Sequence, residues 1–163
     1  MLMWALWNHR KRWKRIFYYL HYFWYLVLKE YKIYIKKSYT DLDLGKHDEY
    51  LEDLLTADKY HKNDAVILGN IGLAYLDKED YKNAEKYLMK SYKIDKKLTS
   101  TLNNLASLNY QIKKYEKALE WAEESLEINS ENSYTYRILG YIYKALGRIE
   151  ESNEAFGKVK YSK

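Results

Sequence analysis

Few residues in this chain combine the types and the spacing that catalysis or metal binding requires. The four histidines are scattered, and none has a second ligand at a spacing typical of metal sites. There is no glycine-rich phosphate loop and no cysteine. Four glutamates recur at helical spacing, and a solvated helix face explains them better than acid–base pairing does: Glu116, Glu120, Glu123 and Glu127. We therefore expect that the protein is not an enzyme and holds no metal and no cofactor.

The most informative pattern is a sequence repeat with a period of about 34 residues. The first half of each copy carries four matching residues. They are Leu68, Ile71, Gly72 and Tyr75 in the first copy, Leu102, Leu105, Ala106 and Asn109 in the second, and Tyr136, Leu139, Gly140 and Tyr143 in the third. The second half carries Tyr81, Ala84 and Leu88, then Tyr115, Ala118 and Ala122, then Ile149, Ser152 and Phe156. Apolar residues recur at helical spacing on both sides of a short polar turn. Each copy therefore predicts two helices, and the period is typical of a helix-turn-helix solenoid.

The small residues at matching positions predict close helix packing. We expect Gly72, Ala106 and Gly140 to face the small residues of the second helices, which are Ala84, Ala118 and Ser152. The helix axes can then approach to the short end of the range of about 8–10 Å. Gly147 is expected to end its helix in the left-handed conformation. Residues 130–133 contain candidate caps for the start of the next helix.

Composition supports a helical protein. The 163 residues include no proline and six glycines, so long helices meet few breakers. The absence of cysteine excludes a disulfide scaffold and fits a reducing compartment, so we expect a cytoplasmic protein, with membrane association left open. Residues 1–37 have nine lysines and arginines against one acidic residue, a net charge of +8. The remaining residues have a net charge of −3, so the basic total of +5 belongs to the N-terminal segment.

The N-terminal segment, residues 1–30, is both basic and aromatic. A basic cluster precedes an uncharged run, Ile16–Leu28, that contains seven aromatic residues. At about 1.5 Å per residue the run would span about 20 Å as a helix, whereas a bilayer-spanning helix needs about 20 residues. The residues expected to contact a membrane or a partner are Trp4, Trp7, Arg10, Lys11, Arg12, Trp13, Lys14, Arg15, Phe17, Phe23 and Trp24.

Four roles remain open for this segment. Trp and Tyr favour the membrane interface and basic residues attract anionic lipid, which indicates a membrane anchor. A helix buried against the first repeat or a partner subunit would also use these residues. A cleaved targeting segment is disfavoured because no small-residue cleavage motif follows. Nucleic-acid contact is also disfavoured, because the same mixture of basic and aromatic residues serves lipid equally well.

The residues of the three copies resemble the signature of the tetratricopeptide repeat family over 65–163. The resemblance implies an all-α, right-handed helical-repeat solenoid that binds other proteins. The chain departs from the signature at the first slot, where Leu or Tyr stands in place of Trp, and at Asn109, where an aromatic residue is usual. The proline that often ends the second helix is absent. We expect residues 150–163 to form the closing helix, with an exposed end that leaves self-association open.

Residues 31–64 have two possible interpretations. Tyr50, Leu54 and Ala57 match the second helix of a degenerate fourth repeat, but Lys37 and Ser38 fit the first helix poorly. The alternative is an ordinary helical hairpin with its turn at residues 43–45.

The resemblance also implies where a ligand would bind, because the first helix of each repeat lines the concave groove in this family. The residues placed there are Asn70, Leu73, Leu76, Asp77, Asn103, Asn104, Ser107, Tyr110, Gln111, Tyr134, Arg137, Ile138, Tyr141 and Lys144. Asn70 and Asn104 lie one period apart, and an asparagine amide can both donate to and accept from a peptide backbone. The tyrosines predict a partly apolar groove that takes anchor side chains.

The family's clamp for acidic chaperone tails requires Lys and Arg where this chain has Tyr134 and Ile138, so we expect no binding of that kind. The sequence thus favours a non-enzymatic adaptor that binds a protein or peptide segment in the groove. Residues 1–30 would hold it at an anionic membrane surface or in an assembly. The alternative is a structural subunit that uses the N-terminal helix and the exposed solenoid end for assembly.

Overall fold

The computed structural model describes residues 2–43 and 45–159, and describes side chains within 17–27, 29–39 and 45–159. Within these ranges the regular secondary structure is entirely helical. The chain forms two compact units that divide between Lys62 and Asn63, and each is considered by itself. The predicted all-α helical-repeat solenoid is confirmed in the second unit.

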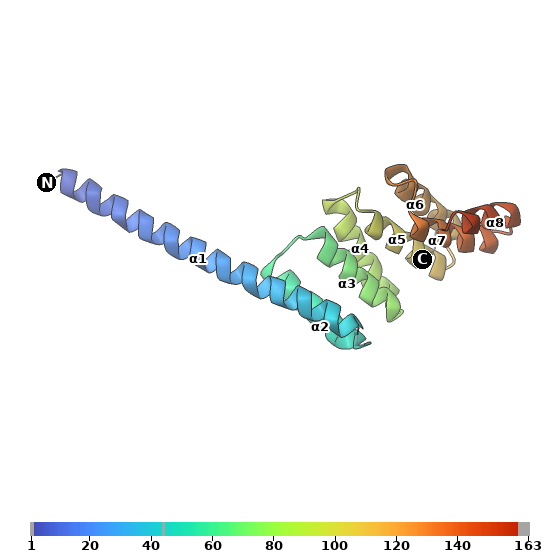
Figure 1. Ribbon diagram of the computed structural model, residues 1–163, viewed down its shortest axis with the longest axis horizontal. Helices are drawn as coiled ribbons and strands as arrows, with labels where there is room; N and C mark the ends of the chain where they lie inside the picture. Colours follow the sequence, from blue (N-terminus) through green and yellow to red (C-terminus); the bar gives the residue numbers. More distant parts are fainter. Residues whose placement is uncertain (1, 44, 160–163) are drawn as a thin grey trace. The chain divides into compact units, whose positions relative to one another are not determined.

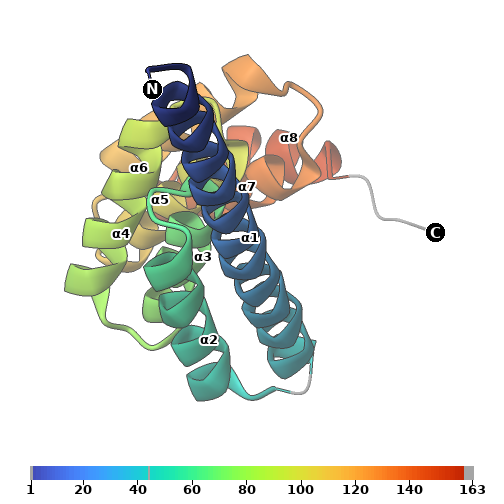
Figure 2. The same ribbon diagram turned by 90° about the vertical axis from the view of Figure 1, so that its left-hand side faces the viewer.

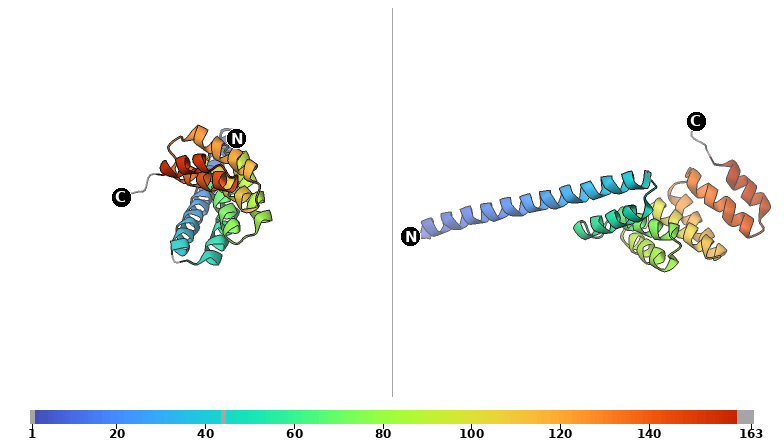
Figure 3. Two further views of the ribbon diagram at one scale, coloured as in Figure 1. Left: turned by 90° about the vertical axis from the view of Figure 1, so that its right-hand side faces the viewer. Right: turned by 90° about the horizontal axis from the view of Figure 1, so that it is seen from below.

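The second unit consists of three pairs of antiparallel helices that follow one another in chain order (Figures 1 and 3). The pairs are α3 (Ala65–Asp77) with α4 (Tyr81–Ile94), α5 (Thr99–Gln111) with α6 (Tyr115–Ile128), and α7 (Ser133–Ala145) with α8 (Ile149–Gly157). The last helix is shorter than the closing helix expected over residues 150–163, because it ends at Gly157. Residues 160–163 lie outside the described part of the chain.

Close packing within a pair depends on the small residues of the first helix. A methyl group added at Gly72 would lie 2.6 Å from Cγ of Leu88, and one added at Gly140 would lie 2.5 Å from the ring of Phe156. The residue opposite Gly72 is therefore Leu88, one turn beyond the expected Ala84. At Gly140 the nearest atoms likewise belong to Phe156, one turn beyond the expected Ser152, and the Ser152 hydroxyl donates to the Gly140 carbonyl at 2.8 Å.

The turns inside the repeats share one backbone conformation. Glu79, Lys113 and Gly147 occupy equivalent positions in successive repeats and have φ values of 58°, 62° and 75°. The next residue of each turn donates its backbone N–H back into the first helix, as Lys114 does to Asn109 at 2.8 Å. The left-handed conformation predicted for Gly147 is confirmed, but two of the three turns place a residue with a side chain there.

Two repeats begin with a side-chain cap. The side chain of Asp64 accepts from the backbone N–H groups of Val66 and Ile67 at the start of α3. Asn132 caps α7 in the same way, as expected for residues 130–133. These bonds satisfy N–H groups that the first turn of a helix leaves unpaired.

The first unit contains α1 (Leu2–Asp43) and α2 (His47–Tyr60), which lies beside the C-terminal half of α1 (Figures 1 and 2). The ring of Tyr34 stacks on that of Tyr60 at a centroid distance of 5.7 Å, and Lys37 pairs with the buried carboxylate of Asp53 at 2.7 Å. Because α1 is continuous, no helix end marks the boundary expected at residue 30.

The turn and the small buried position of the first unit's hairpin lie one period before those of the first repeat. Its turn glycine, Gly45, has a φ of 71° and stands one period before Glu79. Ser38, one period before Gly72, is fully buried. The poor fit of Ser38 to the small slot therefore does not prevent burial there, and the hairpin turn expected at residues 43–45 coincides with the turn position of a repeat.

We expect Lys113→Gly to stabilise the second unit. The left-handed region costs a residue with a Cβ about 1–2 kcal/mol, and glycine avoids this cost. Glycine also gives the unfolded chain more conformational entropy, which offsets part of the gain. The free energy of unfolding should therefore rise by about 0.5–1 kcal/mol. Lys114→Gly is the matched control, because Lys114 has a φ of −91° and glycine therefore relieves no strain there. Denaturant unfolding compares the two variants. Equal destabilisation by both would contradict the expectation.

Candidate functional site

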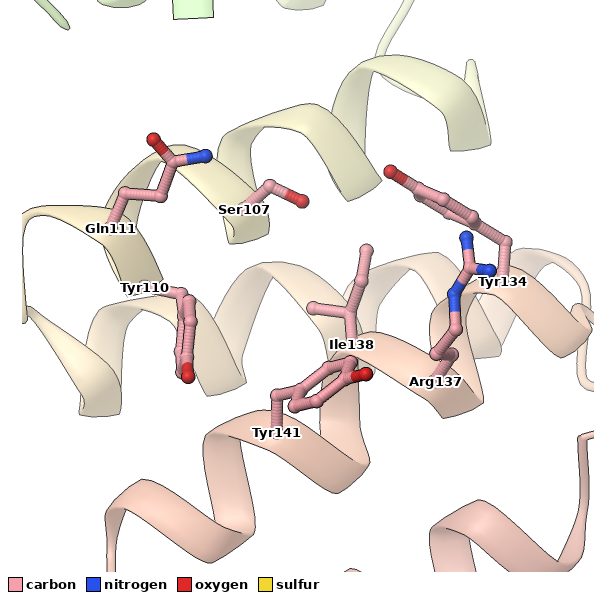
Figure 4. A pocket seen from close by; sticks show the side chains of 7 residues that line it. All are labelled: Ser107, Tyr110, Gln111, Tyr134, Arg137, Ile138 and Tyr141. Atoms are coloured by element: carbon pink, nitrogen blue, oxygen red, sulfur yellow. The ribbon is translucent and has the colours of Figure 1, made fainter. Parts of the chain in front are cut away.

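A pocket of about 210 Å³ opens between α5 and α7 (Figure 4). The residues that line it come one or two turns apart on the two helices: Ser107, Tyr110, Gln111, Tyr134, Arg137, Ile138 and Tyr141. The resemblance to the repeat family implies a groove position for all seven of these residues. The pocket exists because the first helices of adjacent repeats run side by side and direct the same face outward.

Aromatic and aliphatic groups form most of the pocket surface. Ile138 is 8% exposed and lies between the tyrosine pair at one end and Tyr134 at the other (Figure 4). The rings of Tyr110 and Tyr141 lie 6.4 Å apart, and Tyr141 also meets the edge of Phe156 at 5.2 Å. Tyr141 is thus supported from behind while it remains 50% exposed. A supported aromatic ring at the surface is suited to hold an apolar side chain.

Polar groups surround this apolar surface. Gln111 and Ser107 extend from α5, and Arg137 extends from α7 beside Tyr134 (Figure 4). The guanidinium of Arg137 lies 4.9 Å from the centre of the Tyr134 ring, a cation–π distance. An amide, a hydroxyl and a guanidinium offer donors to carbonyl or carboxylate oxygens of a bound segment. The pocket can therefore hold an apolar side chain and bond the backbone next to it.

The other seven predicted groove residues lie outside this pocket. Asn70 and Leu73 are half-buried on α3, and Leu73 packs against the core cluster that contains Leu105. Asp77 and Lys144 are exposed near the ends of α3 and α7. Leu76, also expected in the groove, is 2% exposed and belongs to the core.

Asn103 and Asn104 differ most from the expectation. Asn103 is 2% exposed, and its side-chain oxygen accepts a hydrogen bond from the Thr135 hydroxyl at 2.9 Å. Asn104 is 7% exposed. Asn103 therefore joins α5 to α7 inside the protein rather than facing a groove. Asn104 has little surface left for the peptide contact expected of the Asn70–Asn104 pair.

Sequence reasoning missed a buried hydroxyl pair at each junction between repeats. Ser91 and Thr101 are hydrogen-bonded at 2.7 Å, and Ser125 and Thr135 at 3.2 Å. All four side chains are fully buried. The two pairs lie one period apart, so the period itself was a signal that could have revealed them.

The N-terminal segment presents its aromatic residues to solvent. Phe17, Phe23 and Trp24 are exposed by 59–68%. The side chains of the other predicted arm residues lie outside the described part of the chain: Trp4, Trp7, Arg10, Lys11, Arg12, Trp13, Lys14 and Arg15. Among the described residues no helix has the length and apolar character needed to cross a bilayer. The same part of the chain contains no cluster of three potential metal ligands.

We expect Thr135→Val to lower the free energy of unfolding by about 1–3 kcal/mol, because Asn103 and Ser125 would lose a buried hydrogen-bond partner while side-chain volume is kept. Denaturant unfolding measures the loss. A double-mutant cycle with Asn103→Ala should give a coupling energy above about 0.5 kcal/mol. Coupling within error of zero would contradict a direct bond between the two side chains.

Comparison with known proteins agrees with the helix pairs. The tetratricopeptide repeat model matches residues 65–98, 98–131 and 135–163. The human cell division cycle protein 16 homolog is 26% identical over 102 residues, which cover 57% of this chain and 16% of that protein. The anaphase-promoting complex subunit CDC16 of Saccharomyces cerevisiae is 28% identical over 108 residues, covering 62% and 13% respectively. The chain thus spans less than a fifth of the length of either relative.

A solved structure shows the same architecture. The pilF protein of Pseudomonas aeruginosa superimposes with a TM-score of 0.73 at 20% identity, covering 82% of this chain and 61% of that one. At this identity the similarity shows the fold alone. The matches to the repeat model cover each helix pair from α3 to α8, and the chain belongs to the tetratricopeptide repeat family.

Proposed function

We propose that the protein is a non-enzymatic cytoplasmic adaptor whose α5–α7 pocket binds a segment of a partner protein through an apolar anchor side chain. Tetratricopeptide repeats generally bind proteins or peptides, and this general activity follows from family membership. The observation that supports the specific site is the supported tyrosine pair, Tyr110 and Tyr141, beside the nearly buried Ile138.

The composition of the pocket indicates what the segment would be like. An aliphatic or aromatic residue would cover Ile138 and the tyrosine faces, where apolar area is removed from water. Gln111 and Ser107 could then bond the adjacent backbone carbonyl groups. Arg137 favours a carboxylate close to the anchor. The proposed ligand is therefore an extended segment with one large apolar residue and an acidic neighbour.

Selection from a random peptide library on the immobilised full chain tests this proposal. Selected peptides should bind Tyr141→Ala at least tenfold more weakly, because truncation of an anchoring aromatic residue costs about 2 kcal/mol. Lys144→Ala is the control on the same helix, since Lys144 is exposed and does not line the pocket. Peptides that bind wild type, Tyr141→Ala and Arg137→Ala equally would contradict this assignment.

We also propose that α1 attaches the adaptor to an anionic membrane surface. Ten consecutive residues, 17–26, are all exposed on the helix. Because successive residues of a helix are about 100° apart, these side chains point in every direction around the axis. A groove on one partner would cover only part of these side chains, and Trp and Tyr are enriched at the membrane interface. The basic residues before and after the run would attract anionic lipid.

The alternative proposal is a structural subunit in which protein covers α1 and the last repeat, so that the chain self-associates or joins a complex. The name of the yeast relative, a subunit of a larger complex, supports this alternative. In that case the aromatic run would be an assembly contact, and its removal would change the oligomeric state without lipid.

Co-sedimentation with vesicles of phosphatidylcholine and phosphatidylglycerol separates the two proposals. The full chain should sediment with vesicles at low and high salt, and Phe23→Ser with Trp24→Ser should reduce the bound fraction severalfold, because both side chains are exposed. Ile128→Ser, an exposed apolar residue on α6, serves as the control. Unchanged sedimentation of the α1 variant would contradict membrane attachment. Loss of self-association in that variant without lipid would favour the structural subunit.

A further inference from the structure

A second pocket of about 300 Å³ lies between α6, α7 and α8. It is separate from the α5–α7 pocket, because the two use opposite faces of α7. Tyr134, Ile138 and Tyr141 face the first pocket, whereas Tyr136, Leu139 and Tyr143 face the second. At about 100° per residue these two sets point in opposite directions from the helix axis.

At two positions the second pocket has smaller side chains than the preceding junction, and at two others it has larger ones, because Tyr136 and Tyr143 replace Leu102 and Asn109. One period earlier, the rings of Tyr92 and Trp121 pack edge to face at 5.0 Å and fill the space between α4 and α6. The equivalent residues of the next repeat are Leu126 and Ala155, and both line the pocket. The fold thus accommodates an indole at this position in one repeat, whereas the next has only the methyl group of Ala155 there, beside the rings of Tyr136 and Tyr143.

The floor and walls of the pocket are apolar. Leu139 and Ala155 are buried, with exposures of 3% and 5%, and Leu126 is half-buried beside them. The rings of Tyr136 and Tyr143, two turns apart on α7, form the remaining walls. A bound group therefore needs an apolar or planar portion of about the size of the missing indole.

The rim of the pocket is acidic. Glu123, Glu151 and Glu154 all line it, and the one lining cation is Lys158. Lys158 pairs with Glu154 at 2.7 Å and Arg148 pairs with Glu151 at 2.8 Å. Among the described residues no ion pair within 4 Å is found for Glu123, but the Arg148 guanidinium is near it. The hydrogen bond to Glu151 raises the pKa of Arg148, and the Glu123 carboxylate raises it further. Burial raises the pKa of the Tyr143 phenol, and the nearby Glu123 carboxylate raises it further.

The chain's own cations show how the aromatic walls interact with positive charge. The guanidinium of Arg148 lies 4.6 Å from the centre of the Tyr143 ring, and the ammonium of Lys158 lies 5.4 Å from that of Tyr136. Both distances are typical of cation–π contacts. A further cation that enters the pocket would meet the Glu123 carboxylate beside the same rings.

We propose that the α6–α8 pocket binds an arginine side chain presented by a partner protein. The methylene groups of arginine would cover Leu126, Leu139 and Ala155. Its planar guanidinium can stack on a tyrosine and pair with a carboxylate at the same time, a combination that lysine and tryptophan do not offer. The excess of carboxylates over cations at the rim supplies the charge complementarity.

Nuclear magnetic resonance of the nitrogen-15-labelled full chain tests this assignment with the capped tripeptide Gly-Arg-Gly. Amide signals of residues around Glu123 and Tyr143 should shift and saturate with weak, about millimolar affinity. The same tripeptide with citrulline, a neutral isostere of arginine, should bind at least tenfold more weakly. Equal binding of the two probes, tighter binding of Gly-Trp-Gly, or no shift in this region would overturn the proposal.

Two variants test the pocket, one by removing a rim charge and the other by filling the cavity. Glu123→Gln should weaken binding of the arginine probe about tenfold without affecting the fold, because Glu123 is exposed. Ala155→Trp should fill the pocket as Trp121 fills the preceding junction, and should abolish the shifts. Glu116→Gln, on the first turn of α6 and away from the pocket, is the matched control. Undiminished binding by Glu123→Gln would overturn the assigned role of the carboxylate.

Discussion

In the first and third repeats the two helices approach so closely that no side chain fits between them at one point, and the second repeat admits only the methyl group of Ala106 there. At Gly72 the opposing atoms belong to Leu88, and at Gly140 they belong to Phe156. Any larger residue would displace a buried side chain or separate the helices, and interior packing has little free volume to absorb such a shift. The close approach brings the Ser152 hydroxyl within 2.8 Å of the Gly140 carbonyl, so a polar bond strengthens the apolar contact. It also positions Phe156 behind Tyr141, which gives the α5–α7 pocket a supported wall.

Much of the fold could be predicted because the period places equivalent residues in equivalent environments. The small residues at matching positions and the helix pairs follow from the repeated pattern, whereas the left-handed Gly147 and the Asn132 cap follow from residue type. Glu79 and Lys113 could not be predicted to be left-handed from their residue types, since side chains disfavour that conformation. Their spacing of one and two periods from Gly147 does indicate the left-handed conformation. Tertiary packing overrides local preference at these two turns.

The sequence could predict a pocket residue only where the position of that residue around its helix determines whether it is exposed. Tyr110, Tyr134 and Tyr141 line the α5–α7 pocket because they share one face of the first helices. Asn103 shares the polar character of a groove residue, yet it lies inside because Thr135 from the next repeat supplies a hydrogen-bond partner. That partner is 32 residues away, and no local pattern specifies it. The α6–α8 pocket was equally hidden, because it arises from volume that Ala155 does not fill.

The continuity of α1 has a mechanical consequence. The helix contains neither proline nor glycine, the residues at which helices most often kink. Its 42 residues form a rod about 63 Å long that joins the exposed aromatic run to the part of α1 packed against α2. A tilt or rotation imposed at residues 17–26 is therefore transmitted directly to Tyr34 and Lys37, which hold α2. The orientation of the α1–α2 hairpin is thus coupled to whatever covers the aromatic residues.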